Sequence, residues 1–480
     1  MLEMGDVVVM PLPLGGHGAC QVTGVRDGLV MVCALDWRSD SPPVLGDLRD
    51  AGPLSVDHHS WEGGPKPTWV SADVPLPAGF VVLGSLPLHA AMPRECDSYG
   101  PWEGEALQVE LQRHWDLRLP AAAKAAYKAA SARQVEVDLG GPPLRRPGQV
   151  SRLDLREHRD EVRWAGLDAL PQVTTLSWAG AERGLVRALE GRPMITALTW
   201  EDPPDEVDVS RTGLRGLVFP GRAPRRLALP AELMSLRLGG AAPEVVTAAS
   251  AGRWITLALV GGVAAPDGLR GVRDLELDVT GEAVVPAAAG LESLRVRWAG
   301  SYGALAGLDG FDRLHTLELS DAYGVEAAML PAPGGPLRRL GISCLRSSQV
   351  RAIKQRYRGS EVAVRISGAK SDKWLAVNID NPLRDWVDDH KRGGAAACRA
   401  YAAAERAIEG LGVDDHPAAV ADARGILREF VERLNTIEER HGMIDTVLRE
   451  EAFDAFMGLA RRAGVPHAEA GAWFDGWHDF

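Results

Sequence analysis

The sequence predicts a mixed α/β protein built from several parts, and three observations lead to this prediction. A short apolar pattern recurs about every twenty residues between 150 and 368. Alternating valines with an Asp-Gly pair mark short strands near the start, and helical spacing of apolar residues dominates after 380. We therefore expect a β-rich module over 1–105, a helical linker and cap over 106–149, a stack of parallel strands over 150–368, and an all-helical part over 369–480.

The first module carries three strand signals. The predicted strands are GDVVVMPLP (5–13), ACQVTGV (19–25) and LVMVCAL (29–35). Asp27-Gly28, between the second and third, is a strong hairpin signal. This order resembles the start of the Immunity protein 26 domain, a small β-rich family, over about the first 90 residues. The resemblance implies neutralisation of a toxin delivered by a competing bacterium, and it transfers no catalytic residue.

The linker is predicted to be helical. Residues 104–117 and the alanine-rich 121–132 suit helices, because alanine is the best helix former and proline at 120 is tolerated in a first turn. Residues 134–139 alternate in polarity, which predicts a strand that caps the following stack.

Eleven apolar–x–apolar cores follow at steps of 18 to 24 residues. The cores begin at Leu153, Leu176, Leu198, Leu217, Leu236, Leu257, Leu275, Leu294, Leu317, Leu340 and Val364. Each core is a strand too short to be stable alone, with two apolar side chains on one face. Parallel stacking buries these faces in one continuous core, while the Gly- and Pro-rich segments between cores favour tight returns.

This spacing resembles the leucine-rich-repeat family over about 220 residues and implies a solenoid. The Asn or Cys that usually follows the core is mostly replaced, Cys344 being an exception, so we expect an irregular leucine-rich-repeat solenoid. The overall layout, including NPLRDWVDDH (381–390), is also similar to bacterial repeat proteins labelled gliding motility proteins.

The last part reads as helices near 382–411, 416–440 and 444–463. Asn381-Pro382 has the residue types of a helix start, a capping side chain followed by proline at the first helical position. The aromatic tail, 473–480, is expected to pack back onto these helices.

No catalytic, cofactor or metal site is predicted. The five cysteines are scattered without a CxxC pair, and GxSxG, GxxxxGK[ST] and GxGxxG motifs are absent. Three small clusters combine histidine with carboxylates, and we interpret them as loop or solvated helix: His58-His59, the stretch from Asp385 to His390, and His441 with Asp445. We therefore expect a protein that is not an enzyme.

Charge points to the kind of partner. The net charge is −12, with nine basic and sixteen acidic residues in 1–130 and thirteen against twenty-one in 372–480. Acidic ends favour encounter with a basic protein and disfavour nucleic acid, although they also serve solubility alone. The acidic N-terminus and the lack of a long apolar run predict a cytoplasmic protein with no membrane partner.

A charged strip is expected on the strand face of the stack. The predicted protein-binding residues are Asp274, Glu276, Asp278, Arg295, Arg297 and Glu318. Neighbouring strands lie about 4.8 Å apart, so these side chains should face one another. Two interpretations remain open, an internal salt-bridge ladder and a strip that sets the register of a partner.

The sequence therefore predicts a non-enzymatic protein-binding protein, most specifically a toxin-neutralising immunity protein that acts by occlusion. The alternatives are a repeat scaffold for a regulatory or motility partner such as a small GTPase, and an enzyme with an unrecognised site in the helical part. The sequence does not set the oligomeric state.

Overall fold

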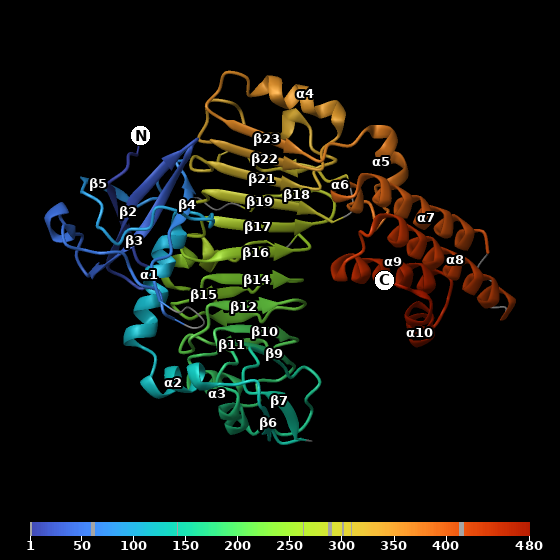
Figure 1. Cartoon of the computed structure of the whole chain (residues 1–480), viewed down its shortest axis with the longest axis horizontal. Coiled ribbons are helices and arrows are strands. Elements are labelled where there is room, and N and C mark those ends of the chain that lie inside the picture. The colour runs from blue at the N-terminus through green and yellow to red at the C-terminus, as the bar shows by residue number, and fades with distance from the viewer. Residues whose placement is uncertain are drawn as a thin grey trace.

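The computed structural model combines an N-terminal antiparallel sheet, a large parallel sheet and a group of C-terminal helices (Figure 1). It describes residues 2–58, 63–141, 143–262, 264–286, 290–299, 302–308, 310–411 and 417–480, with the side chains of 417–421 left out. None of the described helices is both long and apolar enough to cross a membrane.

The N-terminal sheet has five strands in the order β4-β3-β2-β1-β5. Their bounds are β1 Asp6–Pro11, β2 His17–Arg26, β3 Leu29–Ser39, β4 Thr68–Ser71 and β5 Val81–Ser85, with a 3₁₀ turn η1 at Leu45–Leu48. The three predicted strands are confirmed, and Asp27 and Gly28 both have positive φ, as a tight hairpin turn requires. Val8, Val22 and Val32 are fully buried in the core of this sheet.

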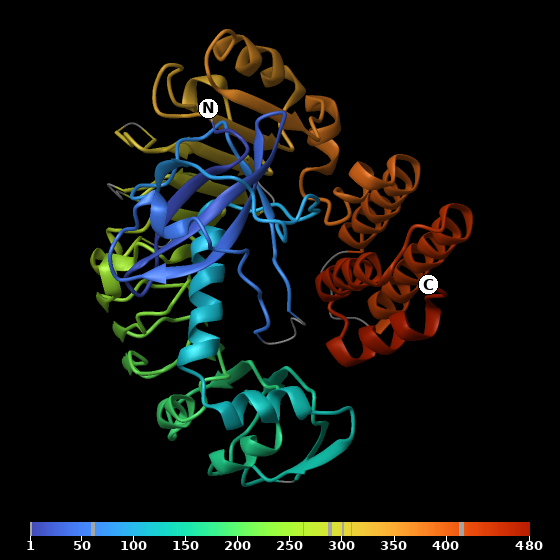
Figure 2. The ribbon, with the colours of Figure 1, turned by 60° about the vertical axis from the view of Figure 1, so that its left-hand side comes forward.

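Helix α1 (Glu103–Leu117) lies between the N-terminal sheet and the strand starts of the parallel sheet (Figures 1 and 2). Ala106 and Val109 pack into the N-terminal core. On its other side, His114 Nδ1 lies 2.9 Å and Arg118 Nη1 2.7 Å from the carboxylate of Glu232, which belongs to the parallel-sheet region. The helix therefore joins the two sheets.

The chain then passes through α2 (Ala121–Ala129) to a small hairpin of β6 (Gln134–Val137) and β7 (Leu144–Pro147). The expected capping strand is β6, but it pairs only with β7 and does not extend the parallel sheet. Val137 and Leu139 are buried, and both contribute to the core of the parallel sheet. The hairpin thus covers the end of the core with side chains.

The parallel sheet contains all eleven predicted strands in chain order. They are β8 Arg152–Asp154, β9 Thr175–Ala179, β10 Ala197–Glu201, β12 Gly216–Phe219, β14 Ser235–Gly239, β16 Thr256–Val260, β17 Asp274–Val279, β19 Ser293–Trp298, β21 Thr316–Ser320, β22 Arg339–Ser343 and β23 Ala363–Ser367. The first residue of each strand pairs with the first residue of the next, so the register predicted from the apolar cores is confirmed. The paired leucines are buried, except that Val364 and Ile366 of the edge strand are half-buried.

Short returns connect these strands. They are β11 Glu206–Asp208, β13 Arg226–Ala228, β15 Val245–Thr247, β18 Ala283–Val284, β20 Leu305–Ala306, η2 Trp164–Ala169, η3 Ala249–Gly252, η4 Asp267–Leu269, η5 Ala327–Met329, α3 Leu185–Glu190 and α4 Ser347–Arg356. The turn after a strand commonly holds one residue of positive φ, supplied by glycine at 180, 240 and 261. Asp321 and Cys344 adopt the same conformation after β21 and β22.

The C-terminal helices form a separate apolar core. They are α5 Asp372–Asn378, α6 Trp386–Asp389, α7 Lys391–Glu409, α8 Pro417–His441, α9 Thr446–Arg462 and α10 His467–Trp477. The predicted helix start at Asn381-Pro382 is wrong. Asn381 is buried, it donates to Cys398 O at 2.9 Å and accepts from Leu383 N at 3.0 Å, so the segment is a turn instead. Trp473 and Phe474 of the tail are buried in this core, as expected.

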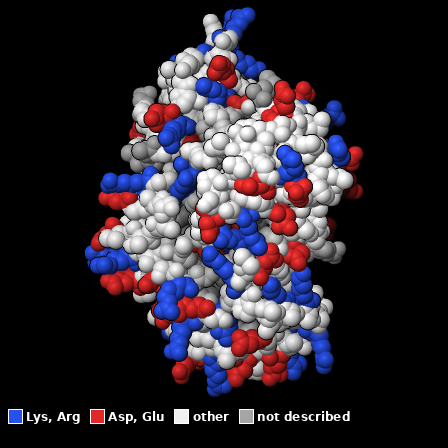
Figure 3. Space-filling model, turned by 90° about the vertical axis from the view of Figure 1, so that its left-hand side faces the viewer, with Lys and Arg blue, Asp and Glu red and all other residues white. Residues whose placement is uncertain are grey.

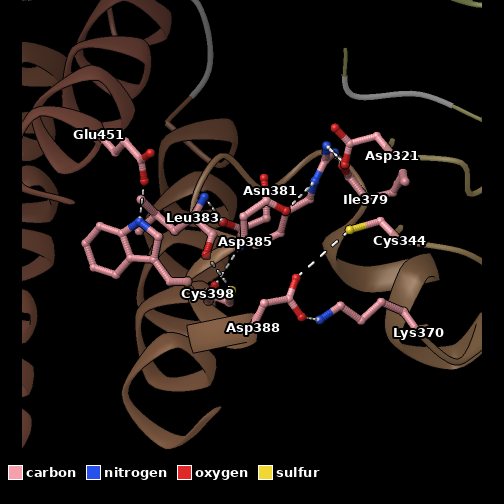
Figure 4. Close-up of polar contacts among 12 residues, drawn as sticks. Asp321, Cys344, Lys370, Ile379, Asn381, Leu383, Asp385, Asp388, Cys398 and Glu451 are labelled. Carbon is pink, nitrogen blue, oxygen red and sulfur yellow. Dashed lines mark hydrogen bonds and ion pairs between the residues drawn. The ribbon is translucent and has the colours of Figure 1, made fainter. Parts of the chain in front are cut away.

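Ion pairs attach these helices to the strand ends (Figure 4). Arg384 Nη2 lies 3.2 Å from Asp321 Oδ1, and the Arg384 side chain is 9% exposed. Lys370 pairs with Asp388, and Cys344 Sγ lies 4.0 Å from the same carboxylate. Asp321 and Cys344, two turn residues of positive φ, thus contact the C-terminal region through their side chains.

Candidate binding cleft and charged strip

The six predicted side chains of the charged strip lie together on the strand face. Glu276 and Asp278 of β17 are Cα partners of Arg295 and Arg297 of β19. Arg295 is in turn the partner of Glu318 on β21. Asp274, at the start of β17, pairs with Ser293.

Arg295 is the centre of the strip. Its guanidinium contacts Glu276 and lies 3.7 Å from both Asp274 Oδ2 and Glu318 Oε2. One cation therefore holds three carboxylates on two neighbouring strands, and about half of the Arg295 and Glu318 side chains remains exposed. An exposed pair of this kind contributes little to stability.

A second group forms around Asp278, which lies between Arg297, at 3.0 Å, and Arg237 of β14. Burial alone would raise the pKa of Asp278, but hydrogen bonds from Arg237 and Arg297 bring it below the ordinary 3.8. Sequence reasoning missed Arg237 because β16 lies between β14 and β17. The middle residue of β16 is Ala258, which is small enough for the arginine side chain to pass over it. The sequence does hold one sign of this contact, because Arg237 faces the small Ala258 on the adjacent strand.

A cleft of about 410 Å³ adjoins the strip, between the N-terminal sheet and the parallel sheet. One wall is a row of residues that begin five adjacent strands: Thr256, Asp274, Ser293, Thr316 and Arg339. The other wall comes from the N-terminal region and includes Trp69, Phe80, Tyr99, Trp102 and Glu103. Arg253 and Arg273 both donate to the backbone oxygen of Ala78, at 2.5 and 3.4 Å, which fixes the two walls together at one end.

Carboxylates in the cleft are poorly solvated. Burial, followed by the nearby charges of Glu292 and Asp274, raises the pKa of Glu103. Burial also raises the pKa of Asp274, against the charge of Arg295. Glu292 is 5% exposed, and its Oε1 pairs with Arg273 at 3.2 Å. Its Oε2 accepts no hydrogen bond and lies 3.8 Å from His315 Nε2.

No known protein family, curated protein or solved structure matches this chain. The geometry of the strip and cleft therefore has to indicate what they bind. Asp274, Arg295 and Glu318 belong to both features, so the strip and the cleft form one continuous surface.

The histidine and acidic clusters are placed elsewhere. His58 is buried, and burial followed by the charge of Arg215 lowers its pKa to about 4, so it is neutral at pH 7. His59 lies outside the described residues. Asp388 is paired with Lys370, and Asp445 caps α9 by accepting from Val447 N and Leu448 N. Within the described ranges, no three His, Cys, Asp or Glu side chains meet in a way that could hold a metal ion.

Four of the five cysteines, Cys20, Cys33, Cys344 and Cys398, are not activated nucleophiles. Burial raises the pKa of the Cys33 thiol to about 12 and that of Cys398 to about 11. Burial likewise raises the pKa of Cys20 and Cys344. A thiol with a raised pKa stays protonated at pH 7 and is a weak nucleophile.

Proposed function

We propose that this chain is a non-enzymatic protein-binding protein, most specifically an immunity protein that neutralises a bacterial toxin by covering its functional surface. The observation that carries the proposal is the continuity of the charged strip with the cleft. A flat face with charges at fixed spacing, next to a recess, can receive a surface and a projecting segment of the same partner.

The strip is suited to setting the register of a partner. Its charges stand on strands whose register is fixed by the buried core below, so little order has to be gained on binding. A complementary protein would contact acidic and basic side chains that alternate from strand to strand, about 4.8 Å apart. Interpreting the sheet as a leucine-rich-repeat solenoid agrees with this use of the strand face.

Charge favours a basic protein as the partner. The chain carries −12 overall, and basic and acidic side chains are interspersed on the face that presents the N-terminal sheet (Figure 3). No field of positive charge covers that face, which disfavours nucleic acid there. A basic toxin domain would approach an acidic protein faster.

The test is capture of the partner by the full chain from its native organism, followed by affinity measurement. Replacing Arg295 and Arg297 together by alanine should weaken binding at least tenfold. The matched control is Arg225→Ala with Arg226→Ala, because these arginines are also exposed and paired with glutamates but lie at β13, away from the strip.

The partner's identity decides between the functions. A toxin domain whose activity is inhibited supports the proposal, and a small GTPase bound at the strip supports a scaffold instead. Unchanged affinity in the Arg295/Arg297 variant overturns the assignment of the strip.

A further inference from the structure

The cleft is elongated along one row of the parallel sheet, and this shape selects its occupant. The five strand-start residues of its wall are Cα partners in succession. At about 4.8 Å per strand, the row is about 19 Å long. An extended polypeptide advances about 3.3 Å per residue, so about six residues lying across the strands would match it.

Carboxylates that lack an ion pair or a full set of hydrogen bonds lie near the middle of the row. Glu103 begins α1 on one wall, while Asp274 and Glu292 lie on the other. Among the described residues, Glu103 forms no ion pair, and the almost fully buried Glu292 has one oxygen without a hydrogen bond. A buried carboxylate without full solvation is stabilised by an incoming cation.

Most of the arginines that line the cleft are already engaged. Arg273 is bonded to Ala78 O and Glu292, and Arg295 to three carboxylates of the strip. Arg253 is bonded to the neutral Ala78 O, its Nε is buried without a hydrogen bond, and its charge acts on Glu103 and Glu292 from one side of the cleft. Arg339 stands at the far end of the row, three strands and about 14 Å from Asp274. Its charge therefore acts on a different part of any extended occupant.

We propose that the cleft binds an extended segment of the partner protein and receives one arginine or lysine side chain between Glu103 and Glu292. The inference rests on the proposed function, since it states how a basic partner would be recognised. The rings of Tyr99 and Trp254 line the same cleft and can pack against the methylene groups of such a side chain.

The test uses the full chain and short peptides in isothermal titration calorimetry. The probe is acetyl-Ala-Ala-Arg-Ala-Ala-amide, and its matched control carries citrulline, which has nearly the same shape without the charge. We expect the arginine peptide to bind at least tenfold more tightly than both the citrulline peptide and free arginine. Equal binding of citrulline removes the role of charge, and equal binding of free arginine removes the role of the extended segment.

Two variants locate the binding. Glu103→Gln should weaken the arginine peptide at least tenfold, whereas Glu95→Gln, an exposed glutamate of the same region, should not. Ser293→Trp fills the middle of the row without changing the charge, so it should also abolish peptide binding. This variant replaces Glu103→Gln in the test if Glu103→Gln does not fold. Retained binding in a folded variant, or no binding of the arginine peptide to the wild-type chain, overturns the proposal.

These results separate the two proposals. A captured partner whose affinity depends on Arg295 and Arg297, with no peptide binding, leaves the proposed function standing and rejects the cleft occupant. Peptide binding to a chain for which no partner binds at the strip rejects the proposed function and leaves the cleft occupant standing.

Discussion

The two edges of the parallel sheet, where the strands begin and where they end, carry different kinds of attachment. At the strand starts, the N-terminal region is held by a few bonds, including Arg253 to Ala78 O, and a cleft of about 410 Å³ remains. Just past the ends of β21 and β23, Arg384 meets Asp321 and Lys370 meets Asp388. Where each charge has a partner of opposite sign within the chain, the ion pairs hold two parts of the molecule together. Where carboxylates beside a cavity lack full pairing, they form a candidate binding site.

The largest effect is expected from a change in the core that both edges share. Leu275 is 1% exposed in the middle of the sheet. Replacing it by aspartate buries an unpaired charge and should destabilise the chain by about 4 kcal/mol or more. Denaturant unfolding measures this, with Leu275→Met as a control that should cost less than about 1.5 kcal/mol. A wild-type unfolding midpoint for Leu275→Asp would contradict the buried register.

Removal of the Arg384–Asp321 ion pair at the strand ends should give the next largest loss of stability. Arg384→Met leaves Asp321 without its cation in a partly buried place, and breaking such a pair costs about 3 kcal/mol. We expect faster proteolysis between 369 and 390 together with lower stability. Arg399→Met, on the exposed face of α7, is the control. If both variants were cleaved like the wild type, Arg384 would not hold the two parts together.

A pH-dependent effect is expected where α1 packs against the N-terminal sheet. Burial raises the pKa of Glu105 to about 7 from 4.5, while hydrogen bonds with Thr68 and the Ala34 backbone oppose this. The folded protein therefore holds this proton more tightly than the unfolded chain does. The stability that it contributes is full below about pH 4.5 and is lost as pH rises through about 7, by up to about 3 kcal/mol.

The variant Glu105→Gln cannot ionise, so it should gain stability relative to the wild type between pH 5 and pH 8. Denaturant unfolding at both pH values measures the gain, with Glu95→Gln as the control. A difference between variant and wild type that is the same at both pH values would show that Glu105 ionises normally.

The charged strip should affect stability less. Replacing Arg295 and Arg297 by alanine removes exposed pairs worth about 0–1 kcal/mol each, so the unfolding midpoint should hardly move while partner affinity falls. A loss of several kcal/mol would favour the salt-bridge ladder over a recognition surface.

The smallest expected effect is that of metal removal. We expect a chelator to leave the melting temperature and partner binding unchanged, because no three His, Cys, Asp or Glu side chains of the described residues are grouped so that they could hold a metal ion. Metal analysis with melting in the presence and absence of chelator checks this. Near-stoichiometric zinc, calcium or magnesium, with lower stability after chelation, would refute it.

The sequence predicted the strand stack well because its pattern is local and repeated. Two apolar side chains per core, such as Leu275 and Leu277, indicate both the strand and its buried face, and constant register then places Glu276 beside Arg295. The cleft could not be predicted in this way. It depends on how the N-terminal region sits, and one of its bonds joins Arg253 to a backbone oxygen 175 residues away.

The helix signal at Asn381-Pro382 failed for a tertiary reason. The same asparagine that can cap a helix is buried here, and its side chain is bonded to Cys398 O across the fold. Local signals predict what a segment can form in isolation, and a buried polar side chain takes the partner that the surrounding structure offers.

Successive strand starts are 18 to 24 residues apart, yet they pair in one unbroken register. The extra residues are taken up in the returns, such as the segment around Gly334 and Gly335, and not in the strands. Insertions and deletions in the returns can therefore accumulate over evolution without shifting any residue of the strand face. The same freedom makes that segment a place to graft an epitope tag while the strand face keeps its spacing.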